Sequence, residues 1–453
     1  MDSIIDIILK NKRWSKFNFS PEIKIGNICT DTRTICRGDL FIGLIGDKFD
    51  GNKFYDVAIS KGAGCVVFDK RSKNINFEKI KITIPYIVVD DSLIFLQDLA
   101  REYVKGWKNN GGKLVCVTGS NGKTTTKEML YFLLNLTFPM EVVATKGNLN
   151  NHIGVPLTLL NINAKTKFAV IEIGTNSPGE IKFLSELAQP DIGVITSIGE
   201  SHLEKLINID GVFKEKTSLF DYVTKNSQVA KNCFYSSTGK LSEINKKNNY
   251  QSIELNINFI KIDKSFFKLS LNNLTIDIKN NNLIGDYNFF NYSLAISIAL
   301  ELGVPGNLIQ KNLDIFKPSA SRSEWRDFFG VKVFCDFYNA NPTSMTNAID
   351  AFSSYIEFKM ENSLFVIGDM YELGEFSSEF HQKIGKHLCE IGVKNVVFIG
   401  KYSKYLSEGF GENCEKYNNS EDFNLKNYLS FKISHVFVKG SRGVKLENIF
   451  VDD

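Results

Sequence analysis

The sequence has no hydrophobic run long enough to cross a lipid bilayer, and its start, MDSIIDIILKNKRW, lacks the basic lead and long apolar core of a secretion signal. It also carries little net charge, because 54 Lys and Arg residues balance 51 Asp and Glu residues to a formal +3. So small an excess gives no general surface for polyanions, and nucleic acid is not an expected partner. We therefore expect a cytoplasmic protein without membrane insertion.

Paired cysteines are missing as well. The eight cysteines are scattered at positions 29, 36, 65, 116, 233, 335, 389 and 414, with no CxxC pair and no tight cluster. Cys116 and Cys335 lie inside apolar, strand-like runs. This pattern favours buried free thiols over zinc ligands or disulfides.

A chain of 453 residues, 43% hydrophobic and 23% charged, is of the size and composition of about three globular domains. Apolar runs at 113–119, 167–174 and 191–199 alternate with helix-length segments, a pattern that predicts a mostly parallel sheet with helices on both faces. Within the same domain, 266-FFKLSLNNLTIDIK-279 alternates with period two and predicts an antiparallel hairpin around Asn272-Asn273.

After Pro318 a further α/β segment begins. Its apolar strands are expected at 331–337, 363–369, 395–400 and 435–440. The fold class is therefore α/β with three domains: a small N-terminal α/β domain over 1–88, a central P-loop ATPase-type, mostly parallel sheet over 89–317, and a C-terminal Rossmann-like domain over 318–453. In such sheets ligands gather at the carboxyl ends of the strands.

The segment 115-VCVTGSNGKTTTKEML-130 combines a strand, a glycine-rich loop and the start of a helix. Only Ser120 and Asn121 separate Gly119 from Gly122, whereas the usual P-loop has four residues between its glycines. The succession of strand, loop and helix still directs backbone N–H groups and the positive end of the helix dipole at one point, which suits a triphosphate. Lys123 is expected to pair with the phosphates and the Thr124 hydroxyl to bind Mg²⁺. The alternative is a glycine turn that binds no nucleotide.

Three other polar residues occupy unusual places. Glu172 interrupts the apolar strand 168-FAVIEIG-174, where a carboxylate needs a partner such as a metal. His202 follows the next strand, and Lys216 lies in the helix-length segment after it. Taken singly, such a His is more often a surface or satisfied core residue, and such a Lys an ordinary residue of a helix surface.

In this order, the GSNGKTT loop, the strand Glu, the Ser-His pair and the Lys-Glu-Lys helix resemble the Mur ligases, whose version of the loop is the short one found here. These ATP-dependent enzymes join an amino acid or dipeptide to a UDP-muramyl peptide. The resemblance runs from about residue 31 to 443. It includes the blocks 31-DTRTICRGDLFIGLIGDKFDG-51, 147-GNLNNHIGVPLTLL-160, 171-IEIGTNSPGEI-181, 334-FCDFYNANPTSM-345, 367-IGDMYELGEFSSEFH-381 and 438-VKGSRG-443. The third-domain blocks resemble the member that adds D-Ala-D-Ala to UDP-muramyl tripeptide.

The resemblance implies that ATP converts the tripeptide carboxylate into an acyl phosphate, which the dipeptide amine then attacks. It implies Mg²⁺ at Thr124 and Glu172, and a second Mg²⁺ at His202 and Lys216, with Lys216 as a carbamate. Lys123, Lys216, His202 and Glu172 are the expected catalytic residues. The expected nucleotide contacts are Gly119, Ser120, Asn121, Gly122, Lys123, Thr124, Thr125, Asn291 for adenine, Arg322 for the γ-phosphate and Asp336 for the ribose.

The resemblance also implies substrate contacts. Thr32 and Arg33, with the loop 46–51, are expected to hold the UDP-sugar. Asn150, Asn151, Asn339, Asn341 and Arg442 are the other expected substrate contacts, and Lys439 and Ser441 share the strand ends with them. One departure stands in 285-GDYNFFN-291, where Tyr287 replaces the family's usual His. The alternative interpretations without a binding role are that Arg322 is a solvated linker residue, that Asp336 is a strand-end cap, and that 31–33 form a capped turn.

The sequence leaves three other functions open. Another ligase on the same scaffold, such as folylpolyglutamate synthase or the enzyme that adds the third residue, shares the loop. A P-loop NTPase that drives a partner and a homologue that only binds ligands are the others. The expected partners are small-molecule substrates, and the expected state is a monomer whose domains close to assemble the site.

Overall fold

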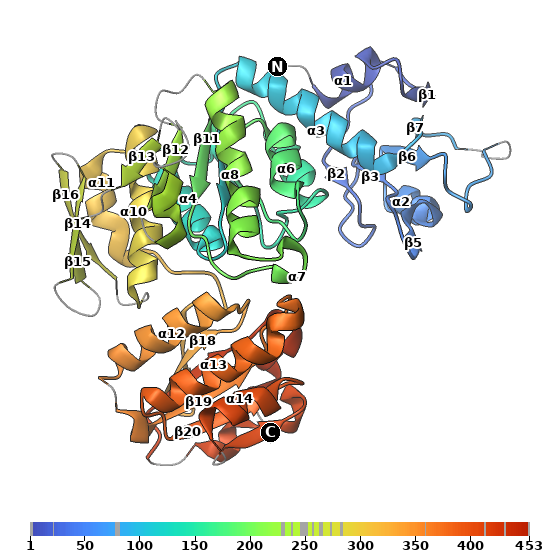
Figure 1. The fold of residues 1–453 in the computed structure, drawn as a ribbon. Coiled ribbons are helices and arrows are strands. Elements are labelled where there is room, and N and C mark those ends of the chain that lie inside the picture. Colours follow the sequence, from blue (N-terminus) through green and yellow to red (C-terminus); the bar gives the residue numbers. More distant parts are fainter. Residues whose placement is uncertain are drawn as a thin grey trace.

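The computed structural model describes residues 3–20, 22–77, 82–227, 232–236, 239–244, 252–255, 258–261, 266–271, 274–280, 284–357, 359–411, 414–429 and 432–451. Figure 1 shows three α/β blocks in chain order: an N-terminal block in blue beside a central block in cyan to yellow, and a C-terminal block in orange and red on one side of the central one. Within the described ranges, no helix is both long and apolar enough to traverse a membrane.

The N-terminal block is built on a five-stranded sheet in the order β1-β7-β6-β3-β2. All its pairings are parallel except β1 with β7. Its elements are α1 (Ile4–Lys10), β1 (Ser15–Phe17), β2 (Ile28–Cys29), β3 (Leu40–Ile42), β4 (Ile45–Gly46), β5 (Phe49–Asp50), α2 (Tyr55–Ser60), β6 (Cys65–Asp69) and β7 (Tyr86–Val89).

Helix α3 (Ser92–Asn109) joins this block to the central one. Its N-cap is Asp91, whose carboxylate accepts hydrogen bonds from two backbone N–H groups of the first turn. On one side, Phe95 packs against Trp14 with ring centroids 4.5 Å apart. On the other, the Tyr103 hydroxyl donates to Ile162 O (2.6 Å) and the Trp107 indole to Thr166 O (2.8 Å). One apolar core therefore continues through both blocks along α3.

The central block contains a six-stranded sheet in the order β13-β12-β11-β8-β10-β9, and every pairing is parallel, as predicted. Helices α3, α6 and α8 pack on one face, and α4 and α10 on the other. The elements are β8 (Lys113–Thr118), α4 (Lys123–Thr137), β9 (Val142–Ala144), α5 (Gly154–Leu159), β10 (Phe168–Glu172), α6 (Glu180–Ala188), β11 (Ile192–Ile195), α7 (Leu203–Leu206), α8 (Ile209–Asn226), β12 (Cys233–Ser236), β13 (Ser252–Leu255), α10 (Asp286–Glu301) and α11 (Gly306–Asn312).

The predicted hairpin is present as β15 (Phe266–Leu271) and β16 (Leu274–Lys279), paired antiparallel. The Asn272-Asn273 turn lies outside the described residues. With β14 (Asn258–Lys261) the hairpin forms a separate three-stranded sheet. Its apolar face, which includes Phe267 and Ile276, packs into the core shared by α4 and α10.

The four strands predicted for the C-terminal block are confirmed as β18, β19, β20 and β22. They belong to a sheet of order β17-β18-β22-β19-β20-β21. Only β17 pairs antiparallel, at one edge. The elements are β17 (Glu324–Phe328), β18 (Val331–Asp336), α12 (Pro342–Tyr355), β19 (Ser363–Gly368), α13 (Ser377–Glu390), β20 (Asn395–Ile399), α14 (Ser403–Phe410), β21 (Glu415–Tyr417) and β22 (His435–Lys439).

The cysteines are free thiols, as predicted, but not all are buried. Cys116 and Cys335 are buried in the sheets, and burial raises the pKa of Cys335 to about 12. Cys36 and Cys389 are exposed, which corrects the prediction for these two positions. Cys36 lies in the loop between β2 and β3 and Cys389 in α13, whereas the five buried thiols lie in strands.

Candidate active site

A cleft of about 1040 Å³ lies between the central and C-terminal blocks. It gathers most of the predicted site residues: Ser120, Asn121, Gly122, Lys123, Thr124, Thr125, Asn150, Asn151, Glu172, His202, Asn291, Arg322, Asp336, Asn339 and Arg442. A smaller adjoining pocket adds Asn341 and Ser441. Both cavities lie where loops from the carboxyl ends of the two parallel sheets meet, as expected for this architecture.

The glycine-rich loop joins β8 to α4. Gly122 has a left-handed backbone (φ 82°), and no side chain caps the first turn of α4. The Ser120 and Asn121 N–H groups donate to Ser197, at 2.9 Å to its carbonyl and 2.8 Å to its hydroxyl. The loop is thus fixed to the neighbouring strand end, while the helix N-terminus faces the cleft and can bind an anion.

The Lys123 ammonium folds over this loop and donates to Gly119 O at 2.7 Å. Burial lowers the pKa of Lys123, and the nearby Arg322 charge lowers it further. Lys216, in turn, has its pKa lowered by burial and then by Lys123. Positive charge from both blocks, on Lys123 and Arg322, therefore meets at the loop, an arrangement that a bound polyanion stabilises.

Glu172 ends β10, and only 2% of it is exposed. Its carboxylate accepts hydrogen bonds from the Thr124 hydroxyl and the Asn150 amide, each at 2.8 Å. The buried hydroxyl and carboxylate oxygens are ligands that Mg²⁺ prefers, so this pair fits the metal site expected from the sequence. Asn150, expected to bind substrate, is here in contact with that carboxylate.

His202 and Lys216 are less obvious metal ligands. The His202 Nδ1 lies 2.6 Å from a Glu372 carboxylate oxygen of the C-terminal block. Lys216 is 1% exposed, which contradicts the alternative of an ordinary surface lysine. Across the described ranges, no cluster of three His, Cys, Asp or Glu side chains is arranged to hold a metal. A metal at this pair therefore fits only if Lys216 supplies oxygen atoms.

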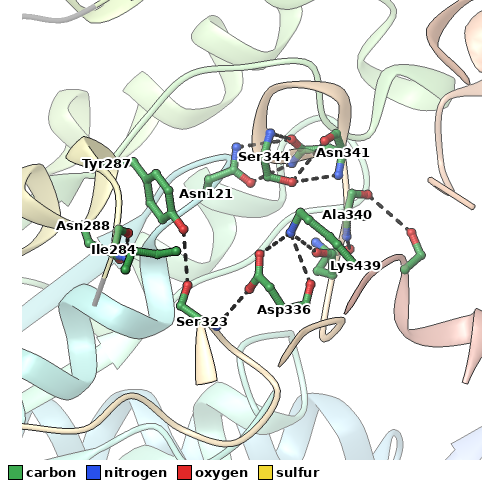
Figure 2. Close-up of polar contacts among 12 residues, drawn as sticks. Asn121, Ile284, Tyr287, Asn288, Ser323, Asp336, Ala340, Asn341, Ser344 and Lys439 are labelled. Carbon is green, nitrogen blue, oxygen red and sulfur yellow. Dashed lines mark hydrogen bonds and ion pairs between the residues drawn. The ribbon is translucent and has the colours of Figure 1, made fainter. Parts of the chain in front are cut away.

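The part of the cleft that is predicted to hold the nucleoside is formed by both blocks. Asn291 in α10 accepts from the Thr126 hydroxyl (3.3 Å) and lies against Gly122. Across the cleft, the Arg322 guanidinium stacks 3.8 Å over the Tyr338 ring. Asp336 accepts from the buried Lys439 ammonium at 2.5 Å (Figure 2). Asp336 is therefore one half of a buried ion pair, not a simple strand-end cap.

Asn341 is the N-cap of helix α12 and forms a capping box with Ser344. Its side-chain amide also exchanges two hydrogen bonds with the Asn121 amide, at 2.8 and 3.2 Å (Figure 2). Nearby, the Thr343 hydroxyl donates to Glu200 at 2.5 Å. The C-terminal block is thus held directly against the glycine-rich loop.

Thr32 and Arg33 do not line this cleft and lie in the N-terminal block. The exposed Arg33 guanidinium pairs with Asp31 at 2.6 Å, and this hydrogen bonding holds the pKa of Asp31 at about 2. Arg442 likewise pairs with Glu447 at 2.8 Å at the cleft edge. The capped-turn alternative for 31–33 is compatible with this geometry.

Sequence reasoning missed several contact residues. Glu372 lies within the block 367–381 and contacts His202, but the sequence predicts no role for it. Thr145 accepts the Lys127 ammonium on its carbonyl (2.8 Å) and the Glu172 N–H on its hydroxyl (2.9 Å). Tyr338 supports Arg322. Only Glu372 and Tyr338 carried a signal, because both lie in blocks singled out by resemblance.

Three family domains match the chain. The Mur ligase family catalytic domain matches residues 24–104, the Mur ligase middle domain 117–299, and the Mur ligase glutamate ligase domain 321–434. The chain therefore belongs to the Mur ligase family.

Within this family, the similarity is to UDP-N-acetylmuramoyl-tripeptide--D-alanyl-D-alanine ligases. The protein of that name from Bacillus subtilis is 33% identical, with 94% of this chain and 93% of the relative covered. The one from Buchnera aphidicola (strain Bp) is 34% identical, over 94% and 92%. The crystal structure of MurF from Acinetobacter baumannii matches with a TM-score of 0.81 and 27% identity, over 95% and 93%.

Replacing Gly122 tests the loop geometry. In Gly122→Ala the new Cβ would lie 2.2 Å from the Asn291 side-chain oxygen, on a backbone that L-residues avoid. We expect nucleotide binding, measured by calorimetry, to weaken at least about tenfold while the fold persists. The matched control is Gly303→Ala, which has the same left-handed backbone (φ 93°) but open space around its Cβ. Equal binding losses in the two variants would contradict the role of the Gly122–Asn291 contact.

Proposed function

We propose that this chain joins D-alanyl-D-alanine to UDP-N-acetylmuramoyl-tripeptide in a reaction that converts ATP to ADP and phosphate. The observation that carries the proposal is the convergence of Lys123 and Arg322 on the glycine-rich loop, in a cleft shared by two blocks. The relatives' shared name supplies the substrates. The product is the pentapeptide precursor of peptidoglycan, the wall polymer on which cell shape and division depend.

The first step brings a carboxylate towards the γ-phosphate, so two anions must approach each other. The tripeptide carboxylate oxygen attacks phosphorus, the bond to the bridging oxygen breaks, and ADP leaves with an acyl phosphate formed. Lys123, the N-terminus of α4 and Arg322 place positive charge where negative charge accumulates. Since this charge comes from both sides of the cleft, catalysis requires the two blocks to be closed around ATP.

In the second step the dipeptide amine attacks the acyl carbon. The C–O bond to phosphate breaks, the amine loses a proton and inorganic phosphate leaves. Asn339, Asn341 and Arg442 lie at the C-terminal side of the cleft and its adjoining pocket, where the dipeptide would enter. Arg442 is the cation that suits a dipeptide carboxylate, in exchange for its contact with Glu447.

Thr124 and Glu172 would hold one Mg²⁺, and His202 with Lys216 the second. Bound there, Mg²⁺ would supply positive charge at the phosphates and the developing acyl phosphate. The buried Lys216 has a pKa lowered well below its usual value, which favours the neutral amine. That amine can add CO₂ and lose a proton, and the resulting carbamate offers oxygen ligands that a lysine ammonium lacks.

The work is divided among three domains in this proposal. Residues 1–88 hold the UDP-sugar through Thr32, Arg33 and the loop 46–51, residues 89–317 bind ATP, and residues 318–453 bind the dipeptide and close over the nucleotide. Asn151, which lines the cleft, is proposed to contact the substrate. We also propose that the enzyme works as a monomer, in the cytoplasm, where ATP is found.

Product analysis tests the proposed reaction directly. Purified protein with ATP and Mg²⁺ is given UDP-muramyl tripeptide and D-Ala-D-Ala, separately and together. We expect ADP release only with both, and a product heavier by the dipeptide less water in mass spectrometry. ADP release that ignores both substrates would instead indicate an NTPase, and transfer of another amino acid would indicate a sister ligase.

A chemical rescue tests the carbamate. In Lys216→Ala the side chain that would carry the carbamate is lost, and we expect kcat to fall at least about 100-fold. Added formate or acetate, which can occupy the vacated space, should restore part of the rate. The control is Lys214→Ala, an exposed residue of the same helix, which should leave the rate unchanged. Full activity in Lys216→Ala would contradict the role of this residue.

A further inference from the structure

The segment that joins the central and C-terminal blocks has an unusual backbone. Ser321 and Ser323 are both left-handed, with φ 61° and 50°, and Arg322 lies between them. Residues other than glycine hold this conformation only where their surroundings fix it. For Ser323, which is 7% exposed, the fixing contacts come from both blocks.

One contact reaches the central block. The Ser323 hydroxyl lies 3.3 Å from the hydroxyl of Tyr287, whose side chain projects from the first turn of α10 (Figure 2). Burial raises the pKa of Tyr287, so its hydroxyl remains protonated and can donate. The other contact reaches the C-terminal block, since the Ser323 N–H donates to Asp336 Oδ1 at 3.1 Å.

Lys439 binds the other carboxylate oxygen of Asp336. It is 2% exposed, and its ammonium donates to Asp336 Oδ2 (2.5 Å) and to the carbonyls of Asp336 (3.3 Å) and Asn339 (3.2 Å). Both carboxylate oxygens of Asp336 therefore have a fixed donor. A chain of contacts runs from Tyr287 through Ser323 and Asp336 to Lys439, and we name it the bridging network.

We propose that Tyr287, Ser323 and Lys439 are positioning residues, whose bridging network fixes Asp336 and Arg322 for the nucleotide at the junction of the two blocks. This inference rests on the proposed use of ATP. Lys439 acts through Asp336 instead of touching the dipeptide, because its three donor contacts all go to Asp336, the last residue of β18, and to Asn339 just after it. Tyr287 thus ties α10, which also carries Asn291, to the C-terminal block.

A double-mutant cycle on the hydroxyl pair tests the network. Tyr287→Phe keeps the ring, and Ser323→Ala keeps the N–H that binds Asp336, so each removes one hydroxyl only. ADP affinity, measured by titration calorimetry, should fall about threefold to tenfold in each single variant. The double variant should match a single one, because the second hydroxyl has no partner left. Tyr103→Phe is the control, since it loses a buried hydroxyl contact far from the cleft.

The control should lose some thermal stability but keep wild-type ADP affinity. Unchanged affinity in both single variants, or fold-changes that multiply in the double variant, would overturn the proposal. Lys439→Met should weaken ADP binding more than tenfold and Lys439→Arg should retain most of it; wild-type affinity in Lys439→Met would also overturn it. If Lys439→Met does not fold, the hydroxyl cycle decides alone.

A kinetic measurement separates positioning from general damage. In Tyr287→Phe the KM for ATP should rise while the KM for UDP-muramyl tripeptide stays unchanged, and an equal rise in both would count against the proposal. ADP binding needs no ligase turnover. The two proposals can therefore fail separately. If the variants lose ADP affinity as predicted but the wild-type protein forms no peptide bond, the proposed reaction is refuted and the bridging network is retained.

Discussion

The hydrogen bond from the Thr124 hydroxyl to the Glu172 carboxylate is the contact on which the site depends. Glu172 lies at the buried end of β10, where an unpartnered carboxylate would be strongly unfavourable. The parallel register places Glu172 opposite Val117 of β8, one residue before the strand ends and the loop begins. The same strand register therefore brings a carboxylate to the start of α4, where the proposed function needs a ligand for Mg²⁺.

The cleft is formed by residues of both the central and the C-terminal block. The central block supplies the loop, and the C-terminal block supplies Arg322 and Asp336. The reciprocal amide contacts of Asn121 and Asn341 place the cap of α12 directly on the loop. If ATP binds as proposed, movement of the C-terminal block would change the surroundings of its phosphates and ribose together, which gives a physical reason for coupling nucleotide binding to closure.

The strands were predictable because parallel strands buried on both faces are continuous apolar runs, as at 113–118 and 363–368. The loop was predictable because its glycines and Lys123 are adjacent in sequence. Contacts set by packing were not predictable. The apolar core that continues along α3, the separate sheet that holds β15 and β16, and the exposure of Cys36 all depend on neighbours distant in sequence. The partners of Asn150 and Lys439 are remote too, so sequence could assign them polarity but not a contact.

The central claim is that ATP activates the tripeptide carboxylate. An oxygen-transfer experiment tests it most directly: UDP-muramyl tripeptide labelled with ¹⁸O in its terminal carboxylate is turned over with ATP and D-Ala-D-Ala, and the phosphate released is analysed by mass spectrometry. An acyl phosphate requires one ¹⁸O to leave with each phosphate. Phosphate that carries no label would show that ATP hydrolysis and peptide-bond formation are chemically separate, and would contradict the account.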